Sequence, residues 1–411
     1  MKILLIHQAF TALDEPGGTR HYELSTYFAK NGHEVVIISS PVSYLTGKEQ
    51  GKIGKATSSI GTGKITIQRV MTYRAFHRSF VHRTISFFSF MFSSFWAALF
   101  VPRLDFVWGT SPPIFQAVTA LLIAKLKGAP FLLEIRDLWP AFAIEVGVLK
   151  NPLLIRLSEW LERFLIHQAD CIVVNSPGFI EHVKARGAKH VEVVPNGADP
   201  TIFEPAMNVS DWRERFGLSG KFVVMYAGAH GMSNDLETVL MAAEKMKEDS
   251  QVKFVFVGDG KEKPRLIQVS RQLGLSNVLF LDAVNKIEMP KILAMADACL
   301  AILKPIPLYG TVYPNKVFDY MAAGKPIILA MEGVIKQVVQ QAQAGLAVSP
   351  GDAQAIVDAV LYFKSHPDQA QWMGKNGREL IEKEFNRQKL AAKFLEVFEN
   401  CKKKTSPQQV Q

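Results

Sequence analysis

The chain has 411 residues, of which 48% are hydrophobic and 21% are charged. This length is about twice that at which a single hydrophobic core stops growing, and the composition excludes a disordered protein, so two ordered domains are expected. The formal net charge of +9 is compatible with nucleic acid, an anionic membrane or a phosphorylated substrate, and the position of the charge has to discriminate among them.

The first half of the chain alternates short apolar runs with helical patterns. Its first run, residues 2–7, is too short for a signal peptide and is predicted to be a strand. Near-continuous apolar strands separated by helices indicate a parallel sheet that is covered on both faces. The other strands predicted in this half are residues 34–39, 64–70, 106–110, 131–135, 171–175 and 191–195.

Gly17 and Gly18 follow the first strand and precede a helix that is expected to begin near Thr19. Backbone amides at such a turn can receive a phosphate oxygen. The pair lacks the third glycine of the dinucleotide fingerprint and the Lys-Ser/Thr ending of a P-loop, so both of those nucleotide sites are disfavoured. An ordinary turn is the alternative interpretation.

Residues 50–104 contain eight lysines and arginines but no acidic residue. Within them, residues 84–101 form an uncharged run with six phenylalanines and one tryptophan, at the lower limit of length for a membrane span. Serines and a threonine lower its hydrophobicity, so we expect an interfacial helix on an anionic membrane, with a buried core helix and a true span as alternatives. Nucleic acid is disfavoured because no binding motif accompanies the charge. The predicted membrane contacts are Arg74, Arg78, Arg83, Phe87, Phe88 and Trp96.

Charged residues follow the apolar strand 131–135. Charges at the carboxyl end of a parallel strand face a binding site or pair with one another. Arg136 and Asp137 are therefore candidate catalytic residues that meet the acceptor or the departing sugar. An ion pair of Arg136 with Asp137 or with Glu134 is the structural alternative.

The three cysteines are too few and too scattered for a disulfide framework and lack metal-ligand spacing. Cys171 and Cys299 open apolar runs, so we predict that they are buried as small hydrophobes. Cys401 lies near the end of the chain. Unpaired thiols in a reducing cytosolic setting, and no bound metal, are expected.

The strand-and-helix pattern restarts after residues 195–205, whose prolines, glycine and asparagine predict a linker. The sequence therefore predicts an α/β protein with two Rossmann-like, doubly wound domains that face each other across a cleft, where ligands bind. We assign residues 1–200 to the first domain and 206–386 to the second. Residues 387–411 are assigned to a last helix, which is able to pack on either domain, and a tail predicted to be disordered from Lys402. The strands predicted in the second domain are residues 222–228, 252–258, 278–282, 299–303, 326–330 and 345–350.

Two strands of the second half end in glycine turns. Gly228, His230 and Gly231 follow one strand, whereas Gly258 and then Lys261 follow another. The backbone amides of such turns suit a diphosphate. An ordinary turn histidine is the alternative interpretation of His230.

Residues 311–327 are the most informative segment. Pro314 and Asn315 can open a helix on which Lys316 and Asp319, three residues apart, share a face. A cation there would neutralise a departing diphosphate, and a carboxylate would bind the two hydroxyls of a ribose. A surface ion pair between the two side chains is the alternative.

These segments, in this order and spacing, resemble the retaining glycosyltransferases of family 4, and especially the polysaccharide sugar transferases called WbuB-like. The landmarks are residues 17–39, 110–113, 134–140, 193–199, 257–260 and 314–327. The resemblance implies the GT-B fold, a nucleotide diphosphate sugar bound in the second domain, an acceptor in the first, retention of the anomeric configuration, and neither an obligatory metal nor another cofactor. It also implies that Gly18 approaches the donor diphosphate, Lys316 neutralises it and Asp319 binds the ribose.

The WbuB-like subgroup implies a polyprenyl-diphosphate-linked sugar acceptor in the assembly of bacterial O-antigen, capsule or exopolysaccharide. This agrees with the predicted interfacial helix and places the protein at the cytoplasmic face of the cell membrane. We expect a UDP-linked donor, with an N-acetylated amino sugar as one candidate. The sugar, the acceptor linkage and the oligomeric state are left open.

The chain departs from the family pattern at several positions. Thr311 stands where many members carry the first of two glutamates, and Arg136 stands where a histidine is frequent. The usual arginine-lysine pair is replaced around His230 and Asn234, with Lys261 or Arg265 as candidate substitutes. The acceptor proton goes to Asp137 or to a donor phosphate oxygen. These departures leave two alternatives, a sugar-nucleotide epimerase of the same fold and a catalytically silent membrane-bound assembly protein.

Overall fold

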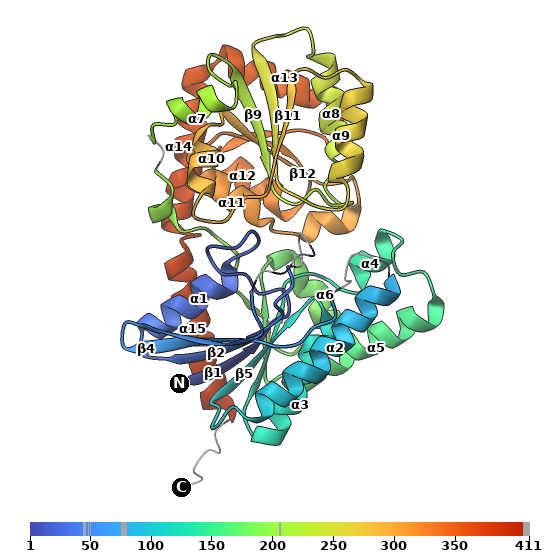
Figure 1. Cartoon of the computed structure of the whole chain (residues 1–411), viewed down its shortest axis with the longest axis vertical. Helices are drawn as coiled ribbons and strands as arrows, with labels where there is room; N and C mark the ends of the chain where they lie inside the picture. The colour runs from blue at the N-terminus through green and yellow to red at the C-terminus, as the bar shows by residue number, and fades with distance from the viewer. Residues whose placement is uncertain (44–46, 48, 50, 75–79, 205–206, 406–411) are drawn as a thin grey trace. The chain divides into compact units, whose positions relative to one another are not determined.

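The structure is a computed structural model that describes residues 1–411 except 44–46, 48, 50, 75–79, 205–206 and 406–411. The chain forms two compact units (Figure 1). The first unit comprises Met1–Ala12, Gly18–Pro195 and Gln388–Gln411, and the second comprises Leu13–Gly17 and Asn196–Arg387. The carboxyl-terminal segment therefore belongs to the first unit.

The first unit is built on an eight-stranded sheet in the order β3-β4-β2-β1-β5-β6-β7-β8. Its neighbouring strands are parallel, except that β3 and β4 form an antiparallel hairpin. The predicted parallel sheet is confirmed, and β3 is an additional, exposed strand. The strands are β1 (Lys2–Ile6), β2 (Glu34–Ser39), β3 (Gly54–Ile60), β4 (Gly63–Arg69), β5 (Phe106–Ser111), β6 (Phe131–Ile135), β7 (Cys171–Val174) and β8 (Glu192–Val193).

Helices cover both faces of this sheet. On one face, α1 (Arg20–Lys30) and α15 (Arg387–Thr405) share a core in which Phe28 and Phe394 pack around Trp108. The other main helices are α2 (Phe80–Leu99), α3 (Ile114–Lys127) and α5 (Pro152–Gln168), and α3 packs against both α2 and α5. Two further helices, α4 (Ala141–Glu145) and α6 (Ile180–Ala185), are short.

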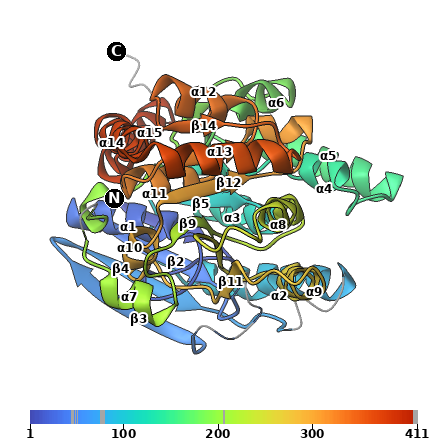
Figure 2. The same ribbon diagram turned by 90° about the horizontal axis from the view of Figure 1, so that it is seen from above.

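The second unit has a six-stranded parallel sheet in the order β11-β10-β9-β12-β13-β14. Its helices also lie on both faces, so the predicted doubly wound class is confirmed (Figure 2). The strands are β9 (Phe222–Ala227), β10 (Val252–Val257), β11 (Val278–Leu281), β12 (Ala298–Ile302), β13 (Ile327–Ala330) and β14 (Gly345–Ala347). One face carries α8 (Leu236–Lys245), α9 (Lys263–Gln272) and α13 (Ala353–Ser365), and the other carries α10 (Met289–Ala294), α11 (Asn315–Ala322) and α12 (Val334–Gln341). The remaining helices are α7 (Ser210–Arg215) and α14 (Pro367–Lys383).

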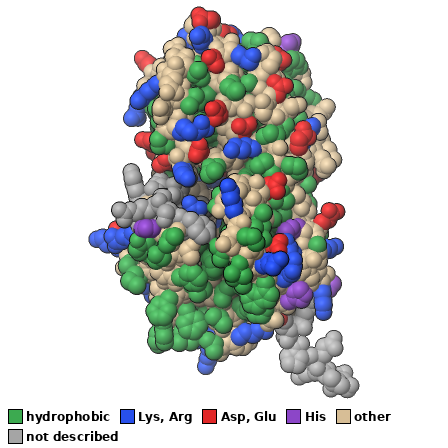
Figure 3. Space-filling model, turned by 90° about the vertical axis from the view of Figure 1, so that its right-hand side faces the viewer, with side chains coloured by type: hydrophobic (Ala, Val, Ile, Leu, Met, Phe, Trp, Pro, Cys, Tyr) green, Lys and Arg blue, Asp and Glu red, His purple; other side chains and the backbone are tan. Residues whose placement is uncertain are grey.

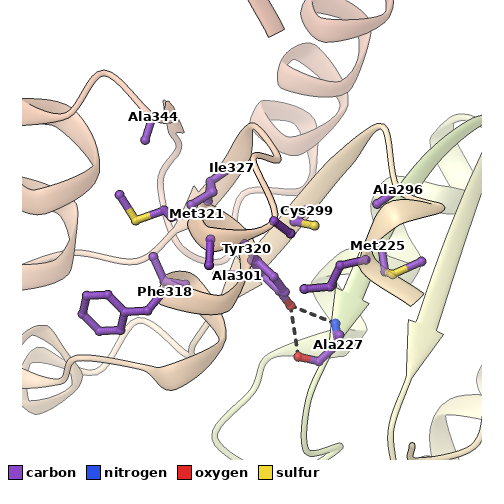
Figure 4. Packing of buried hydrophobic residues seen from close by; sticks show 14 of the residues in the cluster. Met225, Ala227, Ala296, Cys299, Ala301, Phe318, Tyr320, Met321, Ile327 and Ala344 are labelled. Atoms are coloured by element: carbon purple, nitrogen blue, oxygen red, sulfur yellow. Dashed lines mark hydrogen bonds between the residues drawn. The ribbon is translucent and has the colours of Figure 1, made fainter. Parts of the chain in front are cut away.

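The core beneath α11 fixes where that helix lies. Phe318, Tyr320 and Met321 of α11 belong to one buried cluster with Met225 of β9 (Figure 4). The Tyr320 hydroxyl donates to the carbonyl oxygen of Ala227 at 3.1 Å and accepts from the amide of Ala227 at 2.8 Å. Because the side chain is only 1% exposed, this pair of bonds is shielded from water and holds α11 at the carboxyl end of β9.

The prediction of three unpaired cysteines is wrong. Cys171 and Cys401 form a disulfide across a sequence separation of 230 residues, with their Cα atoms 6.1 Å apart. The pairing arises because α15 returns to the first sheet and brings Cys401 to the start of β7, a contact that spacing along the chain does not reveal. Cys299 is free and buried as predicted, and burial raises the pKa of its thiol to about 12.

The predicted disorder of the tail is wrong for residues 402–405. Helix α15 continues to Thr405, and the Lys402 ammonium pairs with Asp105 at 2.7 Å. The helix is stabilised because Leu390, Phe394 and Phe398 are buried in the core of the first unit. Residues 406–411 lie outside the described part of the chain.

Candidate active site

Two glycine turns of the second unit lie at the carboxyl ends of neighbouring parallel strands. Gly228 follows β9 and Gly258 follows β10. A Cβ atom on Gly258, whose φ is +148°, would lie 1.9 Å from the carbonyl oxygen of Gly228. Only glycine fits this approach. The two turns therefore form a close-packed backbone edge where ligands bind in doubly wound sheets.

Lys316 reaches from the first turn of α11 to this edge. Its Nζ donates to Tyr226 Oη at 2.6 Å and to Asn234 Oδ1 at 3.0 Å, and it lies 4.1 Å from the centroid of the Tyr226 ring. Its Nζ would also be 3.3 Å from a Cβ on Gly228. Burial lowers the pKa of Lys316 to about 7. Both hydrogen-bond partners are neutral, so they orient the ammonium group without neutralising its charge.

Tyr226, the penultimate residue of β9, anchors this arrangement. It is only 1% exposed, and its hydroxyl donates to the carbonyl oxygen of Ala229 at 2.7 Å. Burial raises the pKa of the Tyr226 phenol well above its usual value. The hydroxyl therefore stays protonated, and its oxygen accepts the hydrogen bond from Lys316.

His230 is buried in the turn after β9. Its ring lies 5.9 Å from that of Tyr226, and burial, with the nearby charges of Lys263 and Lys316, lowers its pKa to about 4. Among the described residues, neither nitrogen of the His230 ring has a hydrogen-bond partner, and the same is true of Asn315 Oδ1. Unpartnered buried polar atoms are uncommon in folded proteins, and a polar ligand would satisfy them.

Asp319 lies one helical turn after Lys316 and has a different partner. Its Oδ1 accepts from Lys286 Nζ at 2.6 Å, and the two side chains are only 17% and 8% exposed. Lys286 Nζ also lies 5.2 Å from the centroid of the Phe203 ring. The shared helix face is as predicted, whereas the surface ion pair between Lys316 and Asp319 is not formed.

Lys263 stabilises the second glycine turn from below. Its buried Nζ donates to the carbonyl oxygens of Gly258 at 2.9 Å and Leu281 at 3.0 Å and to Asp282 Oδ1 at 2.8 Å. These three bonds tie the ends of β10 and β11 together. They also place a positive charge beside His230.

The family pattern suggests three further positions, Lys261, Arg265 and Thr311. The Lys261 side chain is exposed, and Arg265 forms ion pairs with Glu237 and Glu262 at 2.8 and 2.9 Å. Thr311 ends a short 3₁₀ helix, and its hydroxyl donates to the carbonyl oxygen of Leu308. Gly231 lies in the turn that carries His230, with Asn234 Nδ2 3.5 Å from the place of an added Cβ.

In the first unit, Glu134, the first residue of the predicted motif at residues 134–140, is the centre of a buried ion cluster. Glu134 is 0% exposed and pairs with Arg20 Nε at 2.9 Å and His21 Nε2 at 2.7 Å. Burial opposes ionisation, but His21 and Arg20 hold the pKa of Glu134 well below its usual value, while burial lowers that of His21 to about 4. Trp108 Nε1 donates to the same carboxylate at 3.2 Å. Among the described residues, Glu134 forms ion pairs with Arg20 and His21 of α1, and the charge of Arg136 also helps to hold its pKa down.

Arg136 and Asp137 follow β6 directly. Arg136 Nε donates to Thr110 Oγ1 and its Nη2 donates to the carbonyl oxygen of Pro112, both at 2.6 Å. Burial raises the pKa of Asp137 to about 6, although the charge of Arg136 and the amide of Leu138 oppose the shift. A carboxyl group with a pKa near neutrality is suited to accept a proton.

The predicted glycine pair is divided between the units. Gly17, with φ of +146°, groups with the second unit, and Gly18 groups with the first. Gly18 lies just before Thr19, the residue that precedes α1. Within 4 Å of the place of a Cβ on Gly18 there is no described atom, so the backbone there is open to a ligand.

The run at residues 84–101 forms most of α2, as predicted. Phe88 and Trp96 are each 48% exposed, whereas Phe87 is half-buried with its ring 5.8 Å from that of Phe115. Across the part of the chain that is described, no helix has the length and apolar content that crossing a membrane requires.

The arginines assigned to the membrane have three different outcomes. Arg74 is exposed and pairs with Glu49 at 3.3 Å. Arg83 is half-buried in the first turn of α2. Arg78 lies outside the described residues.

Tyr226, Lys263 and Lys286 were not predicted as site residues. A weak signal exists for Lys263, which with Pro264 opens α9 three residues after a glycine turn. Tyr226 looks like any core residue of an apolar strand, and Lys286 lies in a loop without a motif. The importance of Tyr226 and Lys286 follows only from contacts with residues 90 and 33 positions away.

Two family models match consecutive parts of the chain. Residues 17–197 match the model described as a glycosyl transferase 4-like domain, and residues 208–380 match glycosyl transferases group 1. The chain is 27% identical over 324 residues to the putative colanic acid biosynthesis glycosyl transferase WcaI of Escherichia coli, a match that spans 75% of this chain and 78% of that protein.

Two solved structures share the fold over nearly the whole chain. Sucrose-phosphate synthase from Thermosynechococcus elongatus aligns with a TM-score of 0.78 and 19% identity, over 97% of this chain and 98% of that one. Anabaena HepE in complex with UDP-glucose aligns with a TM-score of 0.70 and 16% identity, over 97% and 100%. These likenesses and the two doubly wound sheets show the GT-B fold. The two matched models, which together cover most of the chain, identify it as a group 1, family 4 glycosyltransferase.

Proposed function

We propose that this glycosyltransferase moves a sugar, with retention of configuration, from a UDP-sugar to a lipid-linked glycan at a membrane surface during the assembly of a bacterial surface polysaccharide. The UDP assignment is supported by the fold shared with HepE, which has been solved with UDP-glucose. The polysaccharide assignment is supported by the similarity to WcaI, whose name refers to colanic acid biosynthesis.

The Lys316 ammonium group is the observation that carries the donor assignment. Tyr226 and Asn234, two neutral partners, hold it beside the turns at Gly228 and Gly258. Among the described residues, its hydrogen bonds are therefore with neutral groups and not with a carboxylate. The Lys316 ammonium group is thus preorganised to bind an anion such as the donor diphosphate. A fixed cation beside the diphosphate stabilises the negative charge that develops on this group when the glycosidic bond to the donor breaks.

Other polar groups complete the proposed donor site. The amides of Gly228 and Gly258 already donate to the carbonyl oxygens of Val257 and Leu281, so we assign the phosphate oxygens to other amides of the two glycine turns, among them that of Gly231. The neutral imidazole of His230 donates one N–H to the same group. Asp319 is fixed by Lys286 through Oδ1, and we assign its Oδ2 to the ribose hydroxyls.

Asp137 is the proposed base for the acceptor hydroxyl. Its raised pKa keeps the carboxylate basic enough to take the acceptor proton near neutral pH. Arg136 is held by Thr110 and Pro112 beside it and would orient the acceptor. Retention requires the acceptor to attack on the face from which the diphosphate leaves, so these groups serve the incoming hydroxyl and Lys316 serves the leaving group.

The acceptor and membrane assignments are supported by α2. Its exposed Phe88 and Trp96, and the absence of any acid in residues 50–104, are typical of a helix that lies in an anionic interface. An acceptor carried on a polyprenyl diphosphate would be met at that surface.

Thermal unfolding with a panel of UDP-, GDP- and dTDP-sugars tests the donor assignment. A ligand that binds the folded state raises the unfolding midpoint, and we expect this with a UDP-sugar and not in the Lys316→Met variant. Transfer is then measured with polyprenyl-diphosphate-linked sugars as acceptors. Conversion of the bound donor to an epimer without any acceptor would favour an epimerase, and no shift with any nucleotide sugar would contradict the proposal.

A further inference from the structure

Helix α5 presents an apolar stripe to solvent that the sequence pattern did not assign to any function. Its exposed side chains recur at helical spacing, and the rings of Trp160 and Phe164 stack 5.5 Å apart at 12°. A helix that only covers a sheet turns such residues inward. The exposed apolar residues are Leu153 (65%), Leu154 (41%), Leu157 (51%), Trp160 (60%) and Phe164 (39%).

The two acids of α5 are turned away from this stripe. Glu162 is buried and pairs with His182 at 2.8 Å, and Glu159 pairs with Arg186 at 3.2 Å, both on the side of α6 and its end. The arginines Arg156 and Arg163 are exposed instead. The acids of α5 therefore lie on the side of α6, whereas the outer face of α5 carries arginines and apolar side chains.

Helix α3 joins the stripe of α5 to that of α2. It packs against both helices, and its exposed residues are Leu122, Lys125 and Leu126. Neither α2 nor α3 contains an acidic residue. Of the two acids of α5, Glu162 is buried and Glu159, with a side chain 29% exposed, pairs with Arg186, so both carboxylates are paired at α6 and its end. Hydrophobic side chains gather over the first unit in Figure 3. On α2 the exposed apolar residues are Val81, Ile85, Phe88, Phe92 and Trp96.

We propose that α5 is a second membrane-contacting helix, which inserts Leu157, Trp160 and Phe164 into an anionic lipid surface while Arg156 and Arg163 meet the headgroups. The inference extends the membrane attachment proposed for α2 and rests on it for the identity of the partner. Aromatic and leucine side chains on one side, with arginines beside them and no acid, are the composition of helices that lie in a lipid interface.

A second copy of the chain fits this face less well. Symmetric pairing of one face with itself would bring Arg156 and Arg163 close to their own copies, and like charges at an interface are unfavourable. An anionic lipid surface instead supplies charges of the opposite sign.

Two contact helices increase the affinity of the protein for a membrane. When α2 is bound, α5 binds as part of the same molecule, so the second contact adds affinity at a high effective concentration. Damage to α5 alone should therefore weaken attachment strongly, and residual binding through α2 should remain.

The test is sedimentation of the full chain with vesicles of phosphatidylglycerol and phosphatidylcholine. We compare the wild type with the α5 variant Leu157→Ser, Trp160→Ser, Phe164→Ser and the α2 variant Phe88→Ser, Phe92→Ser, Trp96→Ser. The control variant Met241→Ser, Leu361→Ser, Trp372→Ser removes apolar side chains of similar exposure, 43–45%, from the second unit. Thermal unfolding checks that each variant is folded.

We expect the α5 variant to bind at least about tenfold more weakly, from the lost burial of three side chains in the interface, and the control to bind like the wild type. A charge reversal, Arg156→Glu with Arg163→Glu, should weaken binding to phosphatidylglycerol vesicles by a similar factor without altering any apolar contact. This second variant keeps the test decisive if the serine variant does not fold.

The outcomes separate this inference from the proposed function. Unchanged binding of both α5 variants, with release of the α2 variant, would overturn the role of α5 and leave the membrane attachment by α2 intact. A wild-type chain that does not bind anionic vesicles would overturn both. A self-associating wild type whose dimer, but not its vesicle binding, is lost in the α5 variant would assign the surface to a second copy and overturn the proposal.

Discussion

Buried polar groups lie at the carboxyl edges of both sheets, but the two edges treat charge differently. In the first unit, Glu134 is neutralised by Arg20 and contacted by His21, so the charges satisfy one another inside the core. In the second unit, the Lys316 ammonium is held by Tyr226 and Asn234 through neutral oxygens. The first arrangement is complete without a ligand, whereas the second leaves a cation uncompensated. A closed set of charges therefore indicates a structural role, and an uncompensated oriented charge indicates a binding role.

The largest effect is expected from breaking the closed set. In Glu134→Gln, Arg20 loses its counter-ion in a buried site, which should lower the free energy of unfolding by about 3–5 kcal/mol. Urea denaturation measures this change. In the matched control, Glu159→Gln removes a partly exposed partner of Arg186, and a loss of at most about 1 kcal/mol is expected. A loss below 1 kcal/mol in Glu134→Gln would show that the cluster is not structural.

Removing the uncompensated charge should have the opposite signature. Lys316→Met should reduce kcat by about 10²–10³-fold, because the departing diphosphate loses its fixed cation. The unfolding midpoint should not fall, since the variant no longer has to bury an amine beside neutral groups. Lys336→Met, which removes a partly exposed lysine paired with Glu332 in the same unit, is the control and should retain its activity. A folded Lys316→Met variant with near-normal kcat would remove Lys316 from the site.

A smaller effect is expected from removing a hydrogen bond that positions the Lys316 ammonium group while Lys316 itself is kept. Tyr226→Phe keeps the ring beneath Lys316 but deletes the hydroxyl, and kcat/KM for the donor should fall by about tenfold, the value of one hydrogen bond to a charged group. Tyr320→Phe is the matched control, because its hydroxyl bonds only to the backbone of Ala227 and serves the core. This control should lower the unfolding midpoint and leave the pH dependence unchanged. The same pH profile in wild type and Tyr226→Phe, with equal kcat/KM, would contradict a positioning role for Tyr226.

The smallest and most specific test is the pH profile of kcat/KM for the free enzyme. Asp137 acts as a base only when ionised, so activity should decline as the pH falls through about 6. Lys316 binds the diphosphate in its charged form, which is lost as the pH rises through about 7 in the free enzyme. The optimum should therefore lie between these values. Asp137→Asn should lose the acid limb along with most of the rate, and an acid limb that persists in this variant would assign it to another group.

The fold was readable from the sequence because buried parallel strands are nearly continuous apolar runs. Every strand predicted from such a run, from residues 2–7 to 345–350, is present in the structure. Strand β3 was missed because an exposed edge strand has no apolar run. The structure shows that β3 pairs with β4 in an antiparallel register through a turn at Gly61, with φ of +60°, and in the sequence this turn is marked only by its glycine.

The sequence predicts site residues only where they belong to a motif. Lys316 and Asp319 share a predicted helix face, but nothing along the chain shows that their partners are Tyr226 and Lys286. The same limit explains the disulfide, since Cys401 meets Cys171 only after α15 has packed on the first sheet. Local periodicity determines an element, whereas a contact between distant elements depends on how those elements assemble.

The return of α15 to the first unit has a consequence for the order of events during synthesis. A ribosome makes β1 early and Leu390, Phe394 and Phe398 late, so the entire second unit is translated before the core around Trp108 is closed. Nascent domains fold as they emerge, so the second unit should reach its native state first. Until α15 arrives, one face of the first sheet is covered only in part, by α1, and the rest of it remains open to chaperones. The half of the protein that is begun first is thus the half that matures last.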